Sequence, residues 1–225
     1  MAFLLPLCQV MGSVLPPQTF DGASDIREAL ADGSVTDAAQ LVDWFAVYLM
    51  DWLAPVEGRG VASACRAVCA ARANGRQSDG MMTEYLTTAV GRLDKKLFHA
   101  ERSALARESR RTAGRRYLHL ALKRYPLSGL AAYKAWIQEG VCDGHPAIVH
   151  GWVCAYSRVD AKTAVHTYLS AVAQYSVQTA VECAVIDSHG ALAVLGPIAS
   201  ELDRHVESAL SSSDLQEWLV AGPGI

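Results

Sequence analysis

Residues 36–52 have the sequence TDAAQLVDWFAVYLMDW, and this stretch decides the fold class. Its apolar side chains recur at the i, i+3, i+4 spacing of one helix face, at Leu41, Trp44, Phe45, Tyr48, Leu49 and Trp52. Thr36 is the expected N-cap, with Asp37 in the first turn. Pro55 is expected to end the helix, because proline has no N–H to donate inside one. The stretch therefore predicts an amphipathic helix that buries one face.

The same helical period returns along almost the whole chain. Further stripes occupy residues 61–68, 82–97, 105–125, 130–136, 149–156, 160–185 and 198–206, while alternating β-branched runs are absent. The expected boundaries are exposed turns at 55–60 and 75–80, then Pro126, Gly140, a first-turn Pro146, an Asp160 N-cap and a break at His189-Gly190. Pro197 either kinks the next helix or lies in its first turn, and Ser213 opens a last short one. We predict one all-α domain over residues 1–225, a bundle of about nine or ten helices. Within it, residues 1–35 are expected to be partly loop, and residues 211–225 a short tail.

Composition excludes several classes of protein. The chain has 225 residues, of which 51% are hydrophobic and 19% charged, so it can bury a core and is not disordered as a whole. Its net charge of −3 gives no general reason to expect nucleic-acid binding. The first residues lack a basic segment and are interrupted by Pro6, and no apolar run is long enough to span a bilayer. We expect a soluble protein of the cytoplasm.

Cysteine and histidine offer the main candidates for metal chemistry. The six cysteines are sparse and lie among alanine and valine, which is typical of buried thiols in a reducing compartment. Cys65 and Cys69 stand one helical turn apart, a spacing that also suits a metal or a strained disulfide. Cys142 and His145 lie in one short segment and could bind a soft metal such as nickel or zinc. The alternative for this pair is a polar loop that leads into the helix begun by Pro146.

Motifs for catalysis are missing. The sequence has no phosphate-binding G-x-x-x-x-G-K-[ST], no H-E-x-x-H and no G-x-S-x-G, and nothing in it nominates a catalytic triad. Charge is nevertheless uneven, because residues 92–124 hold eleven Lys and Arg but three Asp and Glu. Such a basic stripe suits a solvated helix face with internal ion pairs, an interface with an acidic protein or, less well, nucleic acid. The sequence favours a binding or scaffolding protein with no enzymatic activity and no cofactor.

Several motifs, taken in order, resemble the UreF family of urease accessory proteins. They are LPPQTF (15–20), ALADGSVTD (29–37), LVDW (41–44), RESRRTAGRRYL (107–118), His145-Pro146 and the segment from Tyr168-Leu169 to QTAV (178–181). Their order and spacing agree over residues 5–210. Four features differ from the family: Gln18-Thr19 replaces paired glycines, residues 23–27 and Glu182 depart from its pattern, and the basic, aromatic tail is missing. The chain therefore looks like a divergent member.

The resemblance implies an all-α, usually dimeric protein without catalysis of its own. It would bridge a UreD/UreH-type accessory protein and a nickel-carrying UreG-type GTPase, and the complex would deliver nickel to the urease subunits. The alternatives are a helical interaction module that has lost the urease role, and a metal-binding protein centred on Cys142 and His145.

The resemblance also assigns candidate partner-binding residues. Pro16 and Phe20 would shape the N-terminal loop, and Arg107 and Gly114 match the middle motif. The stripe Arg107, Arg110, Arg111 and Arg115 would contact an acidic partner, so that exchanging Arg110 and Arg111 for Glu should weaken the complex and leave helicity intact. Phe20 could instead anchor the core, Gly114 could be a close helix contact, and Arg107 could pair with a carboxylate.

Overall fold

The computed structural model describes residues 23–73, 79–101, 103–125 and 128–210. These residues form helices α2 (Ala23–Ala31), α3 (Ala38–Tyr48), η2 (Leu49–Gly58), α4 (Arg59–Ala73), α5 (Asp79–Ala100), α6 (Ala104–Arg124), α7 (Ser128–Gln138), α8 (Pro146–Tyr156), α9 (Ala161–Glu182) and α10 (Ser188–Leu210). They contain no strand, which confirms the predicted all-α class. Because α3, η2 and α4 follow one another without a break, the described residues form eight separate helical segments, fewer than predicted. The last short helix predicted at Ser213 lies outside these residues.

The helix predicted to end at Pro55 continues through it. Residues 49–58 adopt the wider π-helical turn, with Pro55 inside, and the chain passes directly into α4. A π-helical segment changes the hydrogen-bond register, so a residue without an N–H can be accommodated in a continuous helix. The exposed turn predicted at 55–60 is therefore wrong: Glu57, Gly58 and Gly60 are buried there.

Helix ends elsewhere follow local capping chemistry. Asp37 rather than Thr36 is the N-cap of α3, since its side chain accepts a hydrogen bond from Gln40 N. Asp160 caps α9 as predicted, and Pro146 occupies the first turn of α8. The break predicted at His189-Gly190 lies just before these residues, because the Asp187 carboxylate accepts from Gly190 N at 2.7 Å. Helix α10 then runs through Pro197.

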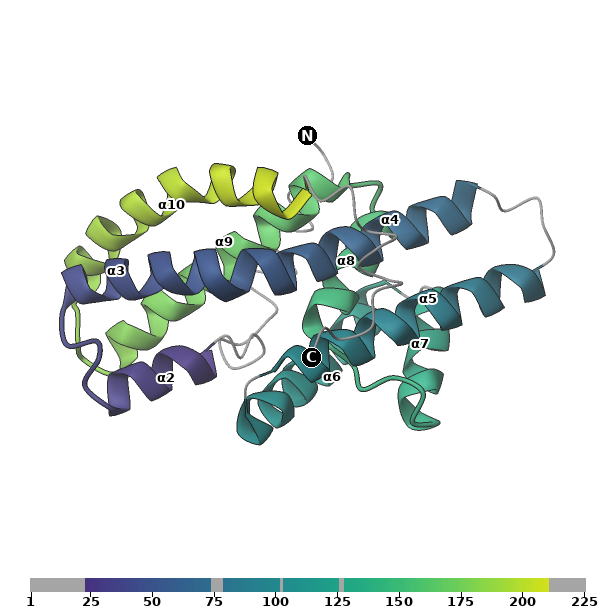
Figure 1. Ribbon diagram of the computed structural model, residues 1–225, viewed down its shortest axis with the longest axis horizontal. Coiled ribbons are helices and arrows are strands. Elements are labelled where there is room, and N and C mark those ends of the chain that lie inside the picture. The colour runs from purple at the N-terminus through teal and green to yellow at the C-terminus, as the bar shows by residue number, and fades with distance from the viewer. Residues whose placement is uncertain (1–22, 74–78, 102, 126–127, 211–225) are drawn as a thin grey trace.

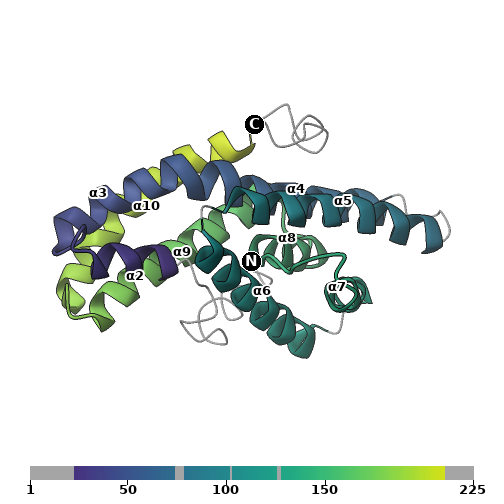
Figure 2. The same cartoon turned by 60° about the horizontal axis from the view of Figure 1, so that its bottom comes forward.

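The long α3–η2–α4 helix forms the axis of the molecule (Figure 1). Helices α10, α9 and α2 lie around its α3 end, and α5, α8, α6 and α7 around its α4 end, as the turned view also shows (Figure 2). Helix α4 packs closely on α8, where a Cβ on Gly151 would lie 2.6 Å from Val61 O. One hydrophobic cluster extends from Ile26 to Ala209, so both ends share a core. No helix among the described residues has the length and apolar character needed to cross a membrane.

Candidate functional site

Helix α6 places three residues of the predicted middle motif on one buried face. Arg110, Gly114 and Tyr117 stand at i, i+4 and i+7, and each is buried. Arg110 faces α2 and η2, whereas Gly114 and Tyr117 face α8 and the loop before it. The motif is therefore a packing face with an arginine in it.

Arg110 lies at the centre of a group of carboxylates that we call the arginine cluster: Arg110, Asp25, Glu57 and Glu101. Its guanidinium is 2.8 Å from Glu57 Oε1, 3.0 Å from Asp25 Oδ2 and 3.2 Å from Glu101 Oε1. Its Nη2 also donates to the Tyr48 hydroxyl. Burial alone would lower the pKa of Arg110, but the surrounding negative groups outweigh it and raise the pKa well above its usual range. The arginine therefore stays charged, and it is the counter-ion of three carboxylates.

Each carboxylate of the cluster comes from a different element. Asp25 lies in the first turn of α2, Glu57 in η2, and Glu101 directly after α5. Glu57 also accepts hydrogen bonds from Trp52 Nε1 at 3.3 Å and from the Tyr168 hydroxyl of α9. The cluster thus ties α2, η2, α6 and α9 together in the middle of the molecule.

The same region contains a group with metal-ligand chemistry. Glu57, Glu101 and His145 place one ligand atom each within 4.8 Å of one another, and all three are buried. His145 Nδ1 accepts a hydrogen bond from Ala147 N, so the ring proton is on Nε2, which faces Glu101 Oε1 at 3.7 Å. A metal at Nε2 would displace that proton and compete with the Arg110 guanidinium for both carboxylates. The arrangement suits an ion-pair network better than a resident metal.

The predicted metal pair of Cys142 and His145 is not assembled in this way. His145 caps α8, and the metal-ligand group among the described residues does not include Cys142. Burial raises the pKa of the Cys142 thiol to about 12, which opposes the thiolate form that binds metals. Cys65 and Cys69 are free thiols, without the disulfide that their spacing would allow.

The predicted arginine stripe divides into buried and accessible positions. Arg115 is exposed, while Arg107 and Arg111 are half-buried. Arg107 donates to the main-chain oxygen of Glu101 at 3.1 Å, and Arg111 pairs with Asp143 at 2.7 Å. Arg110 is 1% exposed, so the structure places it in the core and not in the predicted contact surface. Exchanging it for Glu would add a fourth carboxylate to the cluster, so we expect this exchange to destabilise the fold and not to leave helicity intact.

Gly114 and the N-terminal candidates have different outcomes. A Cβ on Gly114 would lie 1.7 Å from Gly144 O, so Gly114 provides the close helix contact that was one of its two interpretations. Pro16 and Phe20 lie outside the described residues, and their predicted role remains a prediction.

Sequence reasoning did not select Asp25, Glu57, Glu101 or Asp94 as site residues. Asp94 is fully buried and accepts hydrogen bonds from the Tyr133 hydroxyl and from the backbone N–H groups of residues 143–145. The sequence contains one signal for a buried polar network. Asp94 continues the apolar stripe of Val90, Leu93 and Leu97, and Arg110 occupies the core face of α6. A charged residue at a core position of a helical stripe indicates a buried polar network, although it does not identify the partners.

Sequence comparison shows which known proteins this chain is similar to. A sequence model of the UreF family matches residues 35–197, a range that includes Glu57, Asp94, Glu101, Arg110 and Gly114. Urease accessory protein UreF of Lachnoclostridium phytofermentans is 28% identical over 182 residues, which cover 80% of this chain and 72% of that protein. The all-α fold, the order of the motifs and the match over most of the chain lead to one conclusion: the chain belongs to the UreF family of urease accessory proteins.

Proposed function

We propose that the chain is a non-catalytic scaffold of urease maturation in the cytoplasm. It joins a UreD/UreH-type accessory protein to a UreG-type GTPase, acts as a homodimer, and helps deliver nickel to apo-urease. The observation that carries this proposal is the family match over residues 35–197. A scaffold of this kind couples the nucleotide state of the GTPase to assembly when it binds the two states with different free energies.

The structure supports the proposal through helix α6. Its inner face is held by the arginine cluster on one side and by the Gly114 contact with the loop before α8 on the other. Arg115 is exposed on its outer side, and the basic residues of its last turn, Lys123 and Arg124, are exposed as well. A basic face on a firmly held helix suits an acidic surface of another protein, because its backbone does not have to be ordered on binding.

Nickel is the cargo of this assembly, and we expect no resident cofactor in the isolated chain. Glu57 and Glu101 of the metal-ligand group already pair with the Arg110 guanidinium, and burial favours the thiol form of Cys142. These contacts give a separate metal-binding function little support.

Reconstitution with the partners tests the proposal. The tagged chain would be produced with a UreD-type protein, a UreG-type GTPase and apo-urease from one source, and assembly would be followed by sizing chromatography and nickel-dependent urease activity. We expect a defined complex and activation that requires this chain. A chain that stays alone and leaves activation unchanged would favour an interaction module without the urease role.

Charge reversal at the basic face sharpens the same experiment. Arg115→Glu should weaken assembly by roughly 3- to 10-fold, since an exposed charge at an interface acts mainly through electrostatic attraction. Lys134→Glu, a reversal at an exposed cation of α7, is the matched control and should leave assembly unchanged. Equal assembly of the two variants would remove Arg115 from the interface.

A further inference from the structure

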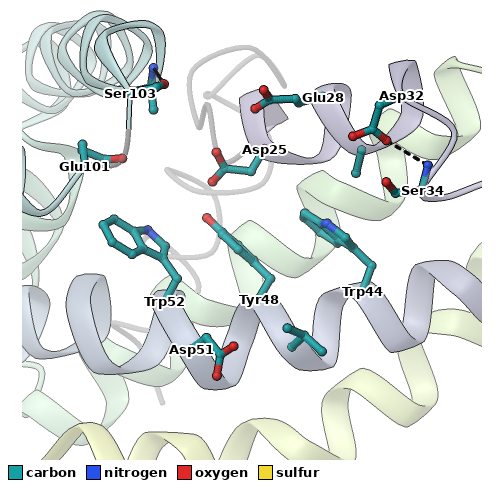
Figure 3. A pocket seen from close by; sticks show the side chains of 13 residues that line it. Asp25, Glu28, Asp32, Ser34, Trp44, Tyr48, Asp51, Trp52, Glu101 and Ser103 are labelled. Carbon is teal, nitrogen blue, oxygen red and sulfur yellow. Dashed lines mark hydrogen bonds between the residues drawn. The ribbon is translucent and has the colours of Figure 1, made fainter.

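A pocket of about 460 Å³ opens beside the arginine cluster, between α2, the α3–η2 helix and the start of α6 (Figure 3). Five carboxylates line it: Asp25, Glu28, Asp32, Asp51 and Glu101. Among the described residues, no Lys, Arg or His lines this pocket. Its size falls within the range of pockets that bind ligands or anchor side chains.

The inner end of the pocket is formed by an acidic group, Glu101. The Glu101 side chain is nearly buried and points into the pocket (Figure 3). Its Oε1 atom receives no hydrogen bond from the described residues, although Arg110 Nε lies 3.2 Å away. Among the residues that the structure describes, Arg110 is the one Lys or Arg paired with Asp25, Glu57 and Glu101, so carboxylates outnumber cationic side chains at the inner end.

One wall of the pocket is aromatic. Trp44, Tyr48 and Trp52 extend from the α3–η2 helix in a row (Figure 3). The rings of Trp44 and Tyr48 stack with centroids 5.0 Å apart and planes 13° apart. Flat aromatic faces beside carboxylates are the surroundings that a planar guanidinium prefers, because it stacks on the rings and donates paired hydrogen bonds at its edge.

The rim favours a protein segment over a free small ion. Val47, which lines the pocket, is 55% exposed, and Leu105, next in sequence to the lining residue Ala106, is 75% exposed. Exposed apolar side chains around a charged pocket are typical of a protein interface with an anchoring side chain at its centre. The segments 1–22 and 211–225 of this chain contain no Lys or Arg, so neither of them supplies a guanidinium or a lysine side chain.

We propose that this pocket receives an arginine side chain presented by another protein of the assembly. The inference rests on the proposed scaffold function and adds a second, acidic docking site to the basic face of α6. The guanidinium stacks on the aromatic wall and pairs with the accessible carboxylates Glu28 and Asp51, with Glu101 behind them.

A pair of short peptides tests the chemistry of the pocket directly. Acetyl-Gly-Arg-Gly-amide would be titrated into the full chain by calorimetry, beside the peptide with citrulline, which has the same shape without the charge. We expect the arginine peptide to bind in the millimolar range and the citrulline peptide to bind at least roughly fivefold more weakly. Absence of arginine binding, or equal binding of the two peptides, would overturn the proposal.

Matched variants locate the binding. Glu28→Gln/Asp51→Asn removes two exposed carboxylates of the pocket and should weaken arginine binding by roughly fivefold or more. Asp43→Asn/Glu139→Gln removes two exposed carboxylates elsewhere and should leave binding unchanged. Unchanged binding by the first variant would place the arginine peptide outside the pocket and refute the assignment.

Assembly with the partners separates this inference from the proposed function. If the wild-type chain assembles, the Glu28→Gln/Asp51→Asn variant should assemble less well than its control, and equal assembly would overturn the inference alone. If the wild-type chain does not assemble, the scaffold function is wrong, and so is the proposal that a protein of this assembly supplies the arginine. The peptide titration would still show whether the pocket binds an arginine side chain. If the wild-type chain forms a dimer that Glu28→Gln/Asp51→Asn loses and the control keeps, the pocket binds a second copy of this chain. That outcome would contradict the proposal that another protein supplies the arginine.

Discussion

Two sets of buried polar groups include a residue of α6, Arg110 in one and Tyr117 in the other, and they satisfy their charged groups in opposite ways. The arginine cluster balances one guanidinium against three carboxylates and borders a pocket. The second network, which we call the α8 network, comprises Asp94 with Tyr133 and the backbone of residues 143–145, and His150 with Tyr117. In it, a carboxylate is surrounded by hydroxyl and backbone N–H donors, and a histidine bonds to neutral groups.

The difference separates a positioning role from a binding role. Asp94 is fully buried and accepts four donors, so its capacity is used and it fixes the loop that leads into α8. The arginine cluster has more negative than positive groups, and Asp25 and Glu101 also line the pocket. The α8 network can only hold the fold, whereas the arginine cluster can also interact with a cation from outside.

The largest expected effect is loss of the cluster's cation. Arg110→Met should lower the free energy of unfolding by about 3–5 kcal/mol, because three carboxylates would remain together without their counter-ion. Chemical denaturation at neutral pH measures this, with Arg111→Met as the control. Arg111 is half-buried and pairs with Asp143, so its loss should cost about 1 kcal/mol or less. Equal losses for the two variants would show that the cluster does not depend on Arg110.

The contrast also shows how far the sequence could predict this molecule. Helical periodicity predicted the all-α class, and the caps at Asp160 and Pro146 were correct, because these features depend on local chemistry. The prediction that a helix ends at Pro55 was wrong. The π-helical turn that accommodates this proline includes the buried residues Glu57 and Gly58, and their burial depends on the tertiary fold.

The candidate site was predictable only in part. Gly114 and the basic stripe were visible in the middle motif, but the partners of Arg110 come from positions 25, 57 and 101. Nothing in their spacing connects them, since the fold alone brings them together. Arg110 consequently looked like its exposed neighbour Arg115, although one lies in the core and the other at the surface.

The next effect concerns pH and the histidine of the α8 network. His150 is fully buried; its Nε2 donates to Ala164 O at 3.0 Å, which leaves Nδ1 to accept from the Tyr117 hydroxyl. Burial lowers the pKa of His150 to about 4. In the unfolded chain the pKa of this histidine is about 6.5, so between pH 6.5 and pH 4 the unfolded state binds more protons than the folded state. The free energy of unfolding therefore decreases as the pH is lowered through this range. From pH 7 to pH 5 this group should remove about 2 kcal/mol of stability.

Unfolding of the wild type and of His150→Gln at both pH values isolates that contribution. The variant should be less stable at pH 7, because it loses the hydrogen bond with Tyr117, yet it should lose less stability on acidification than the wild type does. His205 is a useful comparison, since it is partly exposed on α10. Burial lowers its pKa, and the negative charge of Glu201 acts in the opposite direction. An identical pH dependence of the wild type and His150→Gln would contradict the assignment of the effect to the α8 network.

The last expected effect, similar in size to that of His150, comes from the close contact between α6 and the loop before α8. Gly114→Ala would place a Cβ 1.7 Å from Gly144 O, and that backbone is held by the Asp94 carboxylate, so relief requires a shift of the helix or of the loop. We expect a loss of about 1–3 kcal/mol in the free energy of unfolding. Gly91→Ala in α5 is the matched control: its Cβ would meet Val141 at an ordinary 3.7 Å, and alanine favours a helix, so stability should stay level or rise by about 0.5–1 kcal/mol. If the loop could shift without cost, the two variants would behave alike. Opposite signs would show that the α8 network holds its backbone in a fixed position.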